Sequence, residues 1–439
     1  MSRILRTDQP DFEAAFQNLL TARKDVSADV AQRSAQIIDR VRSGGDPALF
    51  ALTEELDGCT ISAESIRIGN EEIASAVEAT PTSCREAVDL AADRIADYHR
   101  RQKPEDHAFT LPDGSLLGWR WRPVDSAGIY VPGGSACYPS SVLMNAVPAK
   151  VAGVQNLVMT VPTPGGTINP LVLYAAHRAG VDVILRIGGA QAIAALAYGT
   201  QSVPAVDMIT GPGNAYVTAA KKLVYGEVGI DLLAGPSEVA IIADDSIDPE
   251  WIAADLLAQA EHDEDAQSLL LTTSANLAIS VADKIARQLQ RLPRRSIASA
   301  SWEQHGAIVV VRQRKELIDL ANRVAAEHLQ VCAAEPQELI DGIRHAGAIF
   351  SGAWTPEAIG DYVAGPNHVL PTSGTARFAS GLSILNFMKR TTITRMSSDS
   401  FANIAPAGET LAVAEGLDGH ARSLRLRLDE LGRKRDDRN

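Results

Sequence analysis

The sequence predicts an α/β protein with two similar open, mostly parallel sheets. From Gly128 onward, short apolar runs alternate with glycine-rich turns and amphipathic helical patterns. Strands that alternate with helices favour parallel pairing through right-handed crossovers. The length of 439 residues exceeds what one simple core accommodates and suits two or three domains.

The expected elements follow in order along the chain. Before the first strand, DVAQRSAQIIDRVRSGG and CREAVDLAADRIADYHRRQ have the periodicity of amphipathic helices, and Gly44 and Gly45 end the first as a C-cap would. The first sheet is expected to use GIYVPGG, NLVMTVPTP, VDVILRIGG and VDMITGPGN, and the second EVAIIADD, QSLLLTTS, GAIVVV and AGAIFSG. From about Leu382 the strand pattern stops, and a helical tail is expected to pack on a second copy of the chain.

Composition narrows the class of protein. With 46% hydrophobic and 22% charged residues, the chain is typical of a globular protein. Its net charge of −13 disfavours nucleic acid or an anionic membrane as partner, because both would repel it. The N-terminal stretch MSRILRTDQPDF lacks the apolar run of a signal peptide, so a cytoplasmic protein is expected.

The cysteines do not form a recognisable motif. The 4 cysteines show no C-x-x-C spacing, which disfavours a thiolate zinc site and a disulfide framework. Cys137 lies in the glycine-rich VPGGSACYPS and would be a candidate nucleophile, but no nearby His or Asp supports that role. The cysteines are therefore interpreted as small buried hydrophobic residues.

The stretch LLAQAEHDED brings Gln259 and His262 to the end of a predicted helix, with Asp248 as N-cap and Pro249 as first helical residue. Three residues apart, Gln259 and His262 share a helical face, whereas Glu261 points elsewhere. The negative end of the helix dipole also explains a histidine at this position. The stretch by itself therefore fits either a ligand pair or a polar helix end.

Two glycine-rich turns stand beyond strand ends, where open α/β sheets bind ligands. In IGGAQAI and TGPGNAY the backbone could approach a phosphate, and Gln191 and Asn214 add side-chain amides. Neither turn matches G-x-G-x-x-G, because Tyr216 replaces the third glycine. Turns that merely need positive φ are the alternative.

Two short stretches contain candidate hydrogen-bonding and proton-transfer groups. AGPSEV places Ser237 in a tight turn, and the absence of G-x-S-x-G favours substrate hydrogen bonding over nucleophilic attack. NRVAAEHLQ sets Glu327 beside His328, at the expected end of a helix. Acceptors with ordinary pKa values of about 4.3 and 6.5 could serve two different proton transfers. A surface pair without a role is the alternative.

The C-terminal third adds further polar clusters. WTPEAIGDYVAGPNHVLPT places Asp361 and His368 in an expected ordered loop, because its glycines and prolines prevent a continuous helix. AEGLDGHARS adds Glu415 and His420. Nitrogen and oxygen donors without thiolate suit a catalytic zinc ion.

Six motifs resemble, in order and spacing, those of the histidinol dehydrogenase family of zinc- and NAD-dependent enzymes: GPGNAYVTAAK, DLLAGPSEV, LLAQAEHD, AAEHLQ, GDYVAGPNHVLPT and AEGLDGHARS. The resemblance implies a domain-swapped homodimer with two incomplete Rossmann-like domains. The implied parts are a helical segment (1–26), a first domain with most of the site (27–129 and 237–381), an NAD-binding domain (130–236) and a helical tail on the partner (382–439).

The resemblance also implies roles for particular residues. One zinc ion per subunit would be bound by Gln259, His262, Asp361 and His420, with His420 supplied by the other subunit. NAD would contact Tyr130, Gln191 and Asn214. The substrate L-histidinol would contact Ser237, Gln259, His262, His328, Asp361, His368, Glu415 and His420. Glu327 and His328 would be the acid–base pair of two successive NAD+-dependent oxidations that lead through the aldehyde to L-histidine.

Three other functions fit the sequence less well. A paralogue of the same fold could oxidise another small amino alcohol or diol, but Glu415 and His368 suit an ammonium and an imidazole better than a diol. A binding protein with structural zinc is disfavoured because thiolate ligands are lacking. A zinc hydrolase is disfavoured because H-E-x-x-H is absent.

Overall fold

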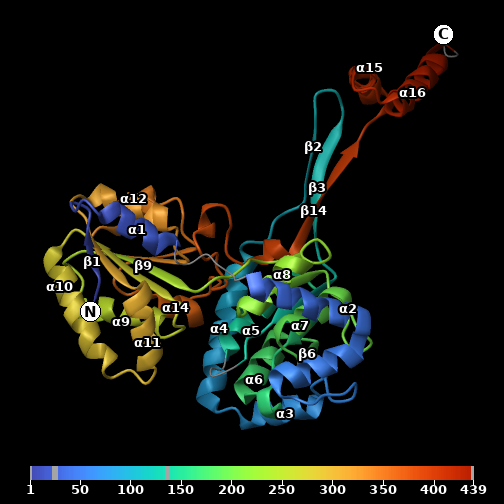
Figure 1. Ribbon diagram of the computed structural model, residues 1–439. Helices are drawn as coiled ribbons and strands as arrows, with labels where there is room; N and C mark the ends of the chain where they lie inside the picture. Colours follow the sequence, from blue (N-terminus) through green and yellow to red (C-terminus); the bar gives the residue numbers. More distant parts are fainter. Residues whose placement is uncertain (1, 22–27, 134–137, 437–439) are drawn as a thin grey trace. The chain divides into compact units, whose positions relative to one another are not determined.

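The computed structural model describes residues 2–21, 28–133 and 138–436. The chain divides into two compact units, one formed by Met1–Gln102 and Val124–Phe387 and the other by Lys103–Pro123 and Met388–Asn439. The first unit contains two parallel sheets, each accompanied by helices (Figure 1). Among the described residues, no helix has both the length and the apolar character needed to cross a bilayer.

A six-stranded parallel sheet, in the order β1-β11-β10-β9-β12-β13, forms one part of the first unit. Alternate residues of its central strand enter different cores: Ala240 and Ile242 pack with α1, α12 and α13, whereas Val239 and Ile241 pack with α9, α10 and α11. The strands are β1 (Ile4–Arg6), β9 (Glu238–Ala243), β10 (Gln267–Thr272), β11 (Ala307–Val310), β12 (His328–Cys332) and β13 (Ala348–Ser351). The helices are α1 (Phe12–Thr21), α9 (Pro249–Ala260), α10 (Ala275–Leu289), α11 (Arg295–His305), α12 (Arg314–Val324), α13 (Pro336–Gly342) and α14 (Glu357–Tyr362).

A five-stranded parallel sheet, in the order β6-β5-β4-β7-β8, forms the other part. Its strands are β4 (Ser126–Tyr130), β5 (Asn156–Thr160), β6 (Val183–Leu185), β7 (Met208–Thr210) and β8 (Gly229–Ile230). The helices are α2 (Ala28–Asp57), α3 (Asn70–Ala79), α4 (Thr82–Arg100), α5 (Pro139–Ala152), α6 (Pro170–Ala179), α7 (Gly189–Tyr198) and α8 (Ala215–Val224). Helix α2 bends at Gly45, where the sequence predicts a helix end.

The grouping of the N-terminal helices differs from the predicted one. Residues 27–129 were expected to join 237–381, but α2 packs on α7 and α8, and α4 packs on α5, beside the five-stranded sheet. The cause is the apolar face of α2, where Ile38, Val41 and Leu52 enter the core shared with α7 and α8. Within the predicted helical segment 1–26, β1 pairs with β11 as an edge strand.

The second unit combines a small sheet with two helices. Strands β2 (His107–Thr110), β3 (Leu116–Pro123) and β14 (Met388–Arg395) form an antiparallel sheet in the order β14-β3-β2. Helices α15 (Ser398–Ala414) and α16 (Asp418–Asp436) pack against each other. The tail after residue 382 therefore includes a strand, contrary to the expectation of a purely helical segment.

Both parallel sheets contain a point where the strand order reverses. In the five-stranded sheet the chain runs outward through β4, β5 and β6 and then returns to the other side of β4 as β7. In the six-stranded sheet the same reversal separates β9 from β12. Such switch points open a crevice at the carboxyl ends of the flanking strands.

Candidate active site

Buried polar side chains gather at the amino ends of two neighbouring central strands. His328 is the first residue of β12, and Glu327 precedes it. Ser237 directly precedes β9, which begins at Glu238. Because β9 and β12 run parallel, these residues share one edge of the sheet. This edge is opposite to the carboxyl ends where open α/β sheets usually bind ligands.

Glu327 is a buried carboxyl group attached to β9 by a hydrogen bond. Its Oε2 accepts from the backbone amide of Glu238 at 3.0 Å. Burial raises the pKa of Glu327 well above its ordinary value; the Glu238 amide and the Ser237 hydroxyl oppose the shift, while the charges of Glu238 and Asp361 add to it. A carboxyl with a raised pKa is a better proton acceptor near neutral pH than an ordinary one.

His328 is held as a neutral imidazole. Its Nδ1 lies 3.2 Å from the carbonyl oxygen of Glu238, and because a carbonyl only accepts, the proton belongs on Nδ1. Its Nε2 has no hydrogen-bond partner among the described residues and lies 3.8 Å from Oδ1 of Asp361. Burial lowers the pKa of His328 to about 3. The lone pair on Nε2 is therefore available to accept a proton.

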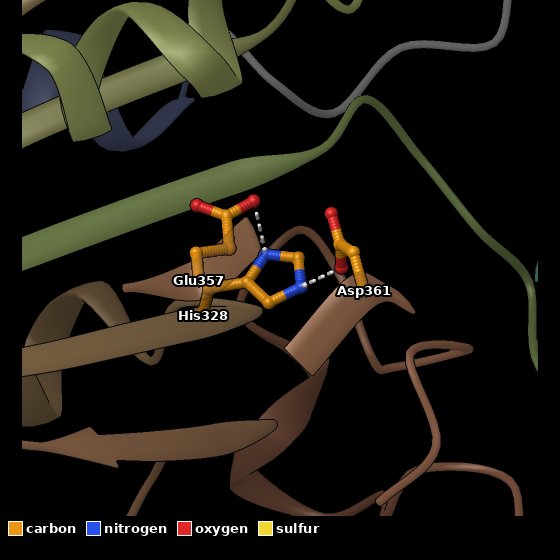
Figure 2. A group of neighbouring side chains, drawn as sticks. All are labelled: His328, Glu357 and Asp361. Atoms are coloured by element: carbon orange, nitrogen blue, oxygen red, sulfur yellow. Dashed lines mark ion pairs between the residues drawn. The ribbon is translucent and has the colours of Figure 1, made fainter. Parts of the chain in front are cut away.

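Helix α14 supplies two carboxyl groups to this histidine. Glu357 and Asp361 are four residues apart, so they share a helical face, and Figure 2 shows both side chains beside the imidazole of His328. Oε1 of Glu357 lies 3.4 Å from Nδ1 of His328. Burial raises the pKa of Asp361 to about 7 and that of Glu357 well above its ordinary value.

Glu357 was not predicted from the sequence, and a loop was expected around Asp361. The short helix α14 ends at Tyr362, before the glycines and prolines that suggested a loop. The i, i+4 spacing of Glu357 and Asp361 is the signal that could have identified Glu357. His328, also expected at a helix end, instead begins a strand.

His368 and the end of α9 complete the cluster. Nδ1 of His368 lies 3.0 Å from the carbonyl oxygen of Asp361, and burial lowers the pKa of His368 to about 4. Nε2 of the buried Gln259 lies 3.4 Å from Nδ1 of His262. The charge of His262 contributes to the lowered pKa of both His328 and His368, so these three histidines are electrostatic neighbours.

Helix α9 begins as predicted but ends earlier than expected. The Asp248 side chain accepts from the amide of Glu250, and Pro249 is the first helical residue. The helix ends at Ala260, and His262 lies in the following turn, where its amide donates to the carbonyl of Gln259. The turn, rather than a continuous helical face, therefore brings the two side chains together.

The cluster fits a divalent cation. Ligand atoms of His328, Glu357 and Asp361 all lie within 4.8 Å of one another. Among the described residues, Oε1 of the buried Gln259 has no hydrogen-bond partner, and a buried unpaired acceptor is costly unless a ligand satisfies it. The nitrogen and oxygen donors suit zinc in a catalytic role.

Two predicted site residues belong to the second unit. Glu415 is the C-cap of α15, and His420 lies in the first turn of α16. Both are exposed within the chain. Their contribution to the cluster around His328 stays a prediction. Cys137, considered as a nucleophile, lies outside the described residues.

A second candidate site lies at the switch point of the five-stranded sheet. Tyr130 ends β4, and its hydroxyl accepts from the amide of Gly189 at 3.1 Å. Gly211 follows β7 with a φ of 117°, and a Cβ there would lie 2.1 Å from the carbonyl oxygen of Tyr130. Only glycine permits this close approach.

The two amide side chains that the sequence suggested, Asn214 and Gln191, differ in burial and hydrogen bonding. Asn214 is the N-cap of α8, where its Oδ1 accepts from two backbone amides of the first turn. Gln191 is fully buried in α7, and its Nε2 donates to Oδ2 of Asp57 at 3.1 Å. Its Oε1 has no partner within the described part of the chain. The site thus offers an unsatisfied acceptor suited to a ligand such as a dinucleotide.

Two parallel sheets, one with a buried acid–base cluster and one with a glycine-lined switch point, define an α/β protein of the oxidoreductase class. The model of the family described as histidinol dehydrogenase matches residues 20–428. The chain belongs to the histidinol dehydrogenase family, as the sequence motifs predict.

Individual relatives agree with this assignment. The chain is 54% identical to the histidinol dehydrogenase of Cereibacter sphaeroides over 98% of this chain and 99% of the relative. It is 55% identical to the histidinol dehydrogenase of Rhodopseudomonas palustris over 97% of this chain and 99% of the relative. The crystal structure of histidinol dehydrogenase from Elizabethkingia anophelis matches with a TM-score of 0.93 and 35% identity, covering 98% of this chain and 99% of that one. The predicted α/β fold with parallel sheets is confirmed.

Proposed function

We propose that the protein oxidises L-histidinol through L-histidinaldehyde to L-histidine, reducing two NAD+, at the cluster around His328. Family membership supports the substrate and the cofactor. The observation that supports the chemistry most directly is the pair of buried, unlike proton acceptors, Glu327 and His328, at the amino end of β12 beside the start of β9. When bound, NAD+ would accept the hydride of each oxidation, and zinc would orient the substrate.

His328 serves the first oxidation. Its Nε2 takes the proton of the alcohol, because Nδ1 is engaged with the carbonyl oxygen of Glu238. The carboxyl group of Glu357 lies beside Nδ1 of the ring and that of Asp361 beside Nε2. Burial of His328 keeps the imidazole neutral before the reaction, which is the form that a base requires.

Glu327 serves the second oxidation. Its carboxylate takes a proton from the water that adds to the aldehyde, and the raised pKa of Glu327 suits this task. The Glu238 amide and the Ser237 hydroxyl orient the carboxylate. His328 therefore acts on the alcohol and Glu327 on the aldehyde, within one site.

We propose further that one zinc ion per subunit is bound by Gln259, His262, Asp361 and His420. The buried, unpaired Oε1 of Gln259 and the closeness of Gln259 to His262 support the first two ligands. The position of Asp361 in the same cluster, beside His328 and His368, supports the third. His420 and Glu415 come from a second copy of the chain in a homodimer, and their exposed positions at the α15–α16 turn support this. Ser237 and His368 contact the substrate, and Tyr130, Gln191 and Asn214 contact NAD.

A turnover assay tests substrate, cofactor and metal together. NADH absorbance is followed with L-histidinol and NAD+, before and after chelation, with a small diol as the matched control substrate. We expect two NADH per histidinol, loss of turnover on chelation and recovery with Zn2+. Turnover of the diol in preference to histidinol would contradict the proposed substrate. Turnover that persists after complete metal removal would contradict the zinc assignment alone.

A further inference from the structure

The last residue of α2, Asp57, lies against the first turn of α7. Oδ2 of Asp57 accepts from Nε2 of Gln191 at 3.1 Å, and the Asp57 carboxylate also interacts with the backbone amide of Gly188. Residues from two separate helices thus meet at the glycine-rich turn that follows β6. The sequence pattern suggested this turn as a place where backbone amides approach a phosphate.

Two amide groups at the start of α7 already have protein partners. The amide of Gly188 interacts with the Asp57 carboxylate, and the amide of Gly189 donates to the hydroxyl of Tyr130 at 3.1 Å. The negative charge of Asp57 also occupies the positive end of the α7 dipole, which would otherwise attract a phosphate. The start of α7 is therefore poorly suited to a phosphate group.

Gln191 instead offers a hydrogen-bond acceptor. A carboxylate only accepts hydrogen bonds, so Asp57 fixes the NH2 group of Gln191 toward itself and directs Oε1 away. Gln191 is fully buried, and its Oε1 has no partner within the described part of the chain. Oε1 lies beside Gly189: a Cβ atom added to this glycine would be 2.5 Å from Oε1. The complementary ligand group is an N–H or O–H donor.

We propose that Asp57 is a positioning residue for the dinucleotide, which holds Gln191 so that its Oε1 accepts a hydrogen bond from an N–H or O–H group of NAD+. The nicotinamide carboxamide, the adenine amino group and the ribose hydroxyls are the groups of this kind. The inference rests on the proposed role of Gln191 in NAD binding. It adds a residue from α2 and the direction of the hydrogen bond.

The variant Asp57→Asn tests the fixed orientation. Asparagine can donate as well as accept, so the Gln191 amide is free to turn and present NH2 to a ligand group that also donates. We expect NAD+ to bind about tenfold more weakly, measured by calorimetry on the full chain without substrate. Asp39→Asn is the matched control, because exposed Asp39 lies on the same helix and loses the same charge; its NAD+ affinity should equal that of the wild type.

A double-mutant cycle with Gln191→Ala separates positioning from a general structural effect, and circular dichroism confirms that each variant is folded. We expect Asp57→Asn to have little effect on NAD+ affinity in the Gln191→Ala background. An equal loss in both backgrounds, or no loss in either, would overturn the role of Asp57. If Gln191→Ala itself leaves NAD+ affinity unchanged while the wild type binds, the proposed cofactor site is wrong.

Discussion

At the scale of single residues, burial shifts two neighbouring acceptors in opposite directions. It raises the pKa of Glu327 and lowers that of His328, because in each case burial disfavours the charged form. Glu327 thereby becomes a stronger base and His328 is kept neutral. The proposed chemistry of the site depends on this contrast.

Replacing His328 should impair the first oxidation and spare the second. In His328→Asn the asparagine retains a polar side chain but has no basic nitrogen, so removal of the alcohol proton should fail. We expect loss of at least about a hundredfold in the rate of histidinol oxidation, with oxidation of added L-histidinaldehyde largely retained. Stopped-flow NADH absorbance with each substrate measures both rates. Equal loss with both substrates would contradict the assignment of His328 to the first step.

The pKa of Glu327 predicts the acid limb of aldehyde oxidation. Protonated Glu327 cannot accept a proton, so the rate should fall as the pH drops through its pKa. Because burial raises that pKa, the limb should lie at a higher pH than the value of about 4.3 typical of glutamate. The pH profile of kcat with L-histidinaldehyde measures it. A rate that stays constant down to the ordinary glutamate range would argue against Glu327 as the base.

At the scale of elements, a buried ion pair holds the turn after β7. Lys221 of α8 pairs with Asp231, and both side chains are almost inaccessible to solvent. Nζ of Lys221 donates to the carbonyl oxygen of Gly211 at 2.9 Å, and Oδ2 of Asp231 accepts from the Gly211 amide at 2.8 Å. The pair therefore fixes the glycine that approaches Tyr130 at the switch point.

Removing the lysine of this pair should destabilise the first unit. Lys221→Met leaves the buried Asp231 carboxylate without its counter-charge, at an expected cost of about 3–5 kcal/mol in the free energy of unfolding. Urea denaturation followed by circular dichroism checks this, with Lys222→Met as the matched control because Lys222 is exposed on the same helix. Similar unfolding midpoints for the two variants would contradict a structural role for the pair.

The sequence predicts some elements better than others for physical reasons. The buried apolar runs of β9 and β10 and the capped start of α9 give strong local signals, and the structure has these elements where expected. Strand β14 was missed because its residues are almost all exposed and therefore lack an apolar face. Strand β1 was missed because three residues are too few to show a period.

Some residues of the candidate site could likewise be predicted from the sequence, and others could not. Residues in recognisable motifs, such as His328 and Asp361, could be selected from the sequence. Glu357 was missed because a loop was expected there, and its spacing from Asp361 indicates a shared face only once α14 is known to be a helix. Asp57 belongs to no recognisable motif, and its hydrogen-bond partner Gln191 is 134 residues away in the sequence.

At the scale of the whole molecule, the proposed site needs two copies of the chain. His420 and Glu415 belong to a unit separate from the one that contains Glu327 and His328. A protein whose site is completed by a partner should be active only as a dimer. This arrangement would also help to keep the reactive aldehyde in a closed site.

Mixing two inactive variants tests the shared site. His420→Asn and His328→Asn should each lack histidinol turnover. If each site combines residues from both copies, subunit exchange between the variants yields dimers with one intact site, and partial activity should return. Sedimentation measures the dimer, and NADH formation measures the recovery. A mixture that forms mixed dimers without activity would show that each site uses residues of one chain.

The division of labour between Glu327 and His328 is tested most directly by counting NADH in a single turnover of Glu327→Gln. Enzyme in excess over L-histidinol, with saturating NAD+, should form one NADH per histidinol and stop at the aldehyde, whereas the wild type should form two. Formation of two NADH at the wild-type rate, or of none, would contradict the proposed role of Glu327 as the base of the second oxidation alone.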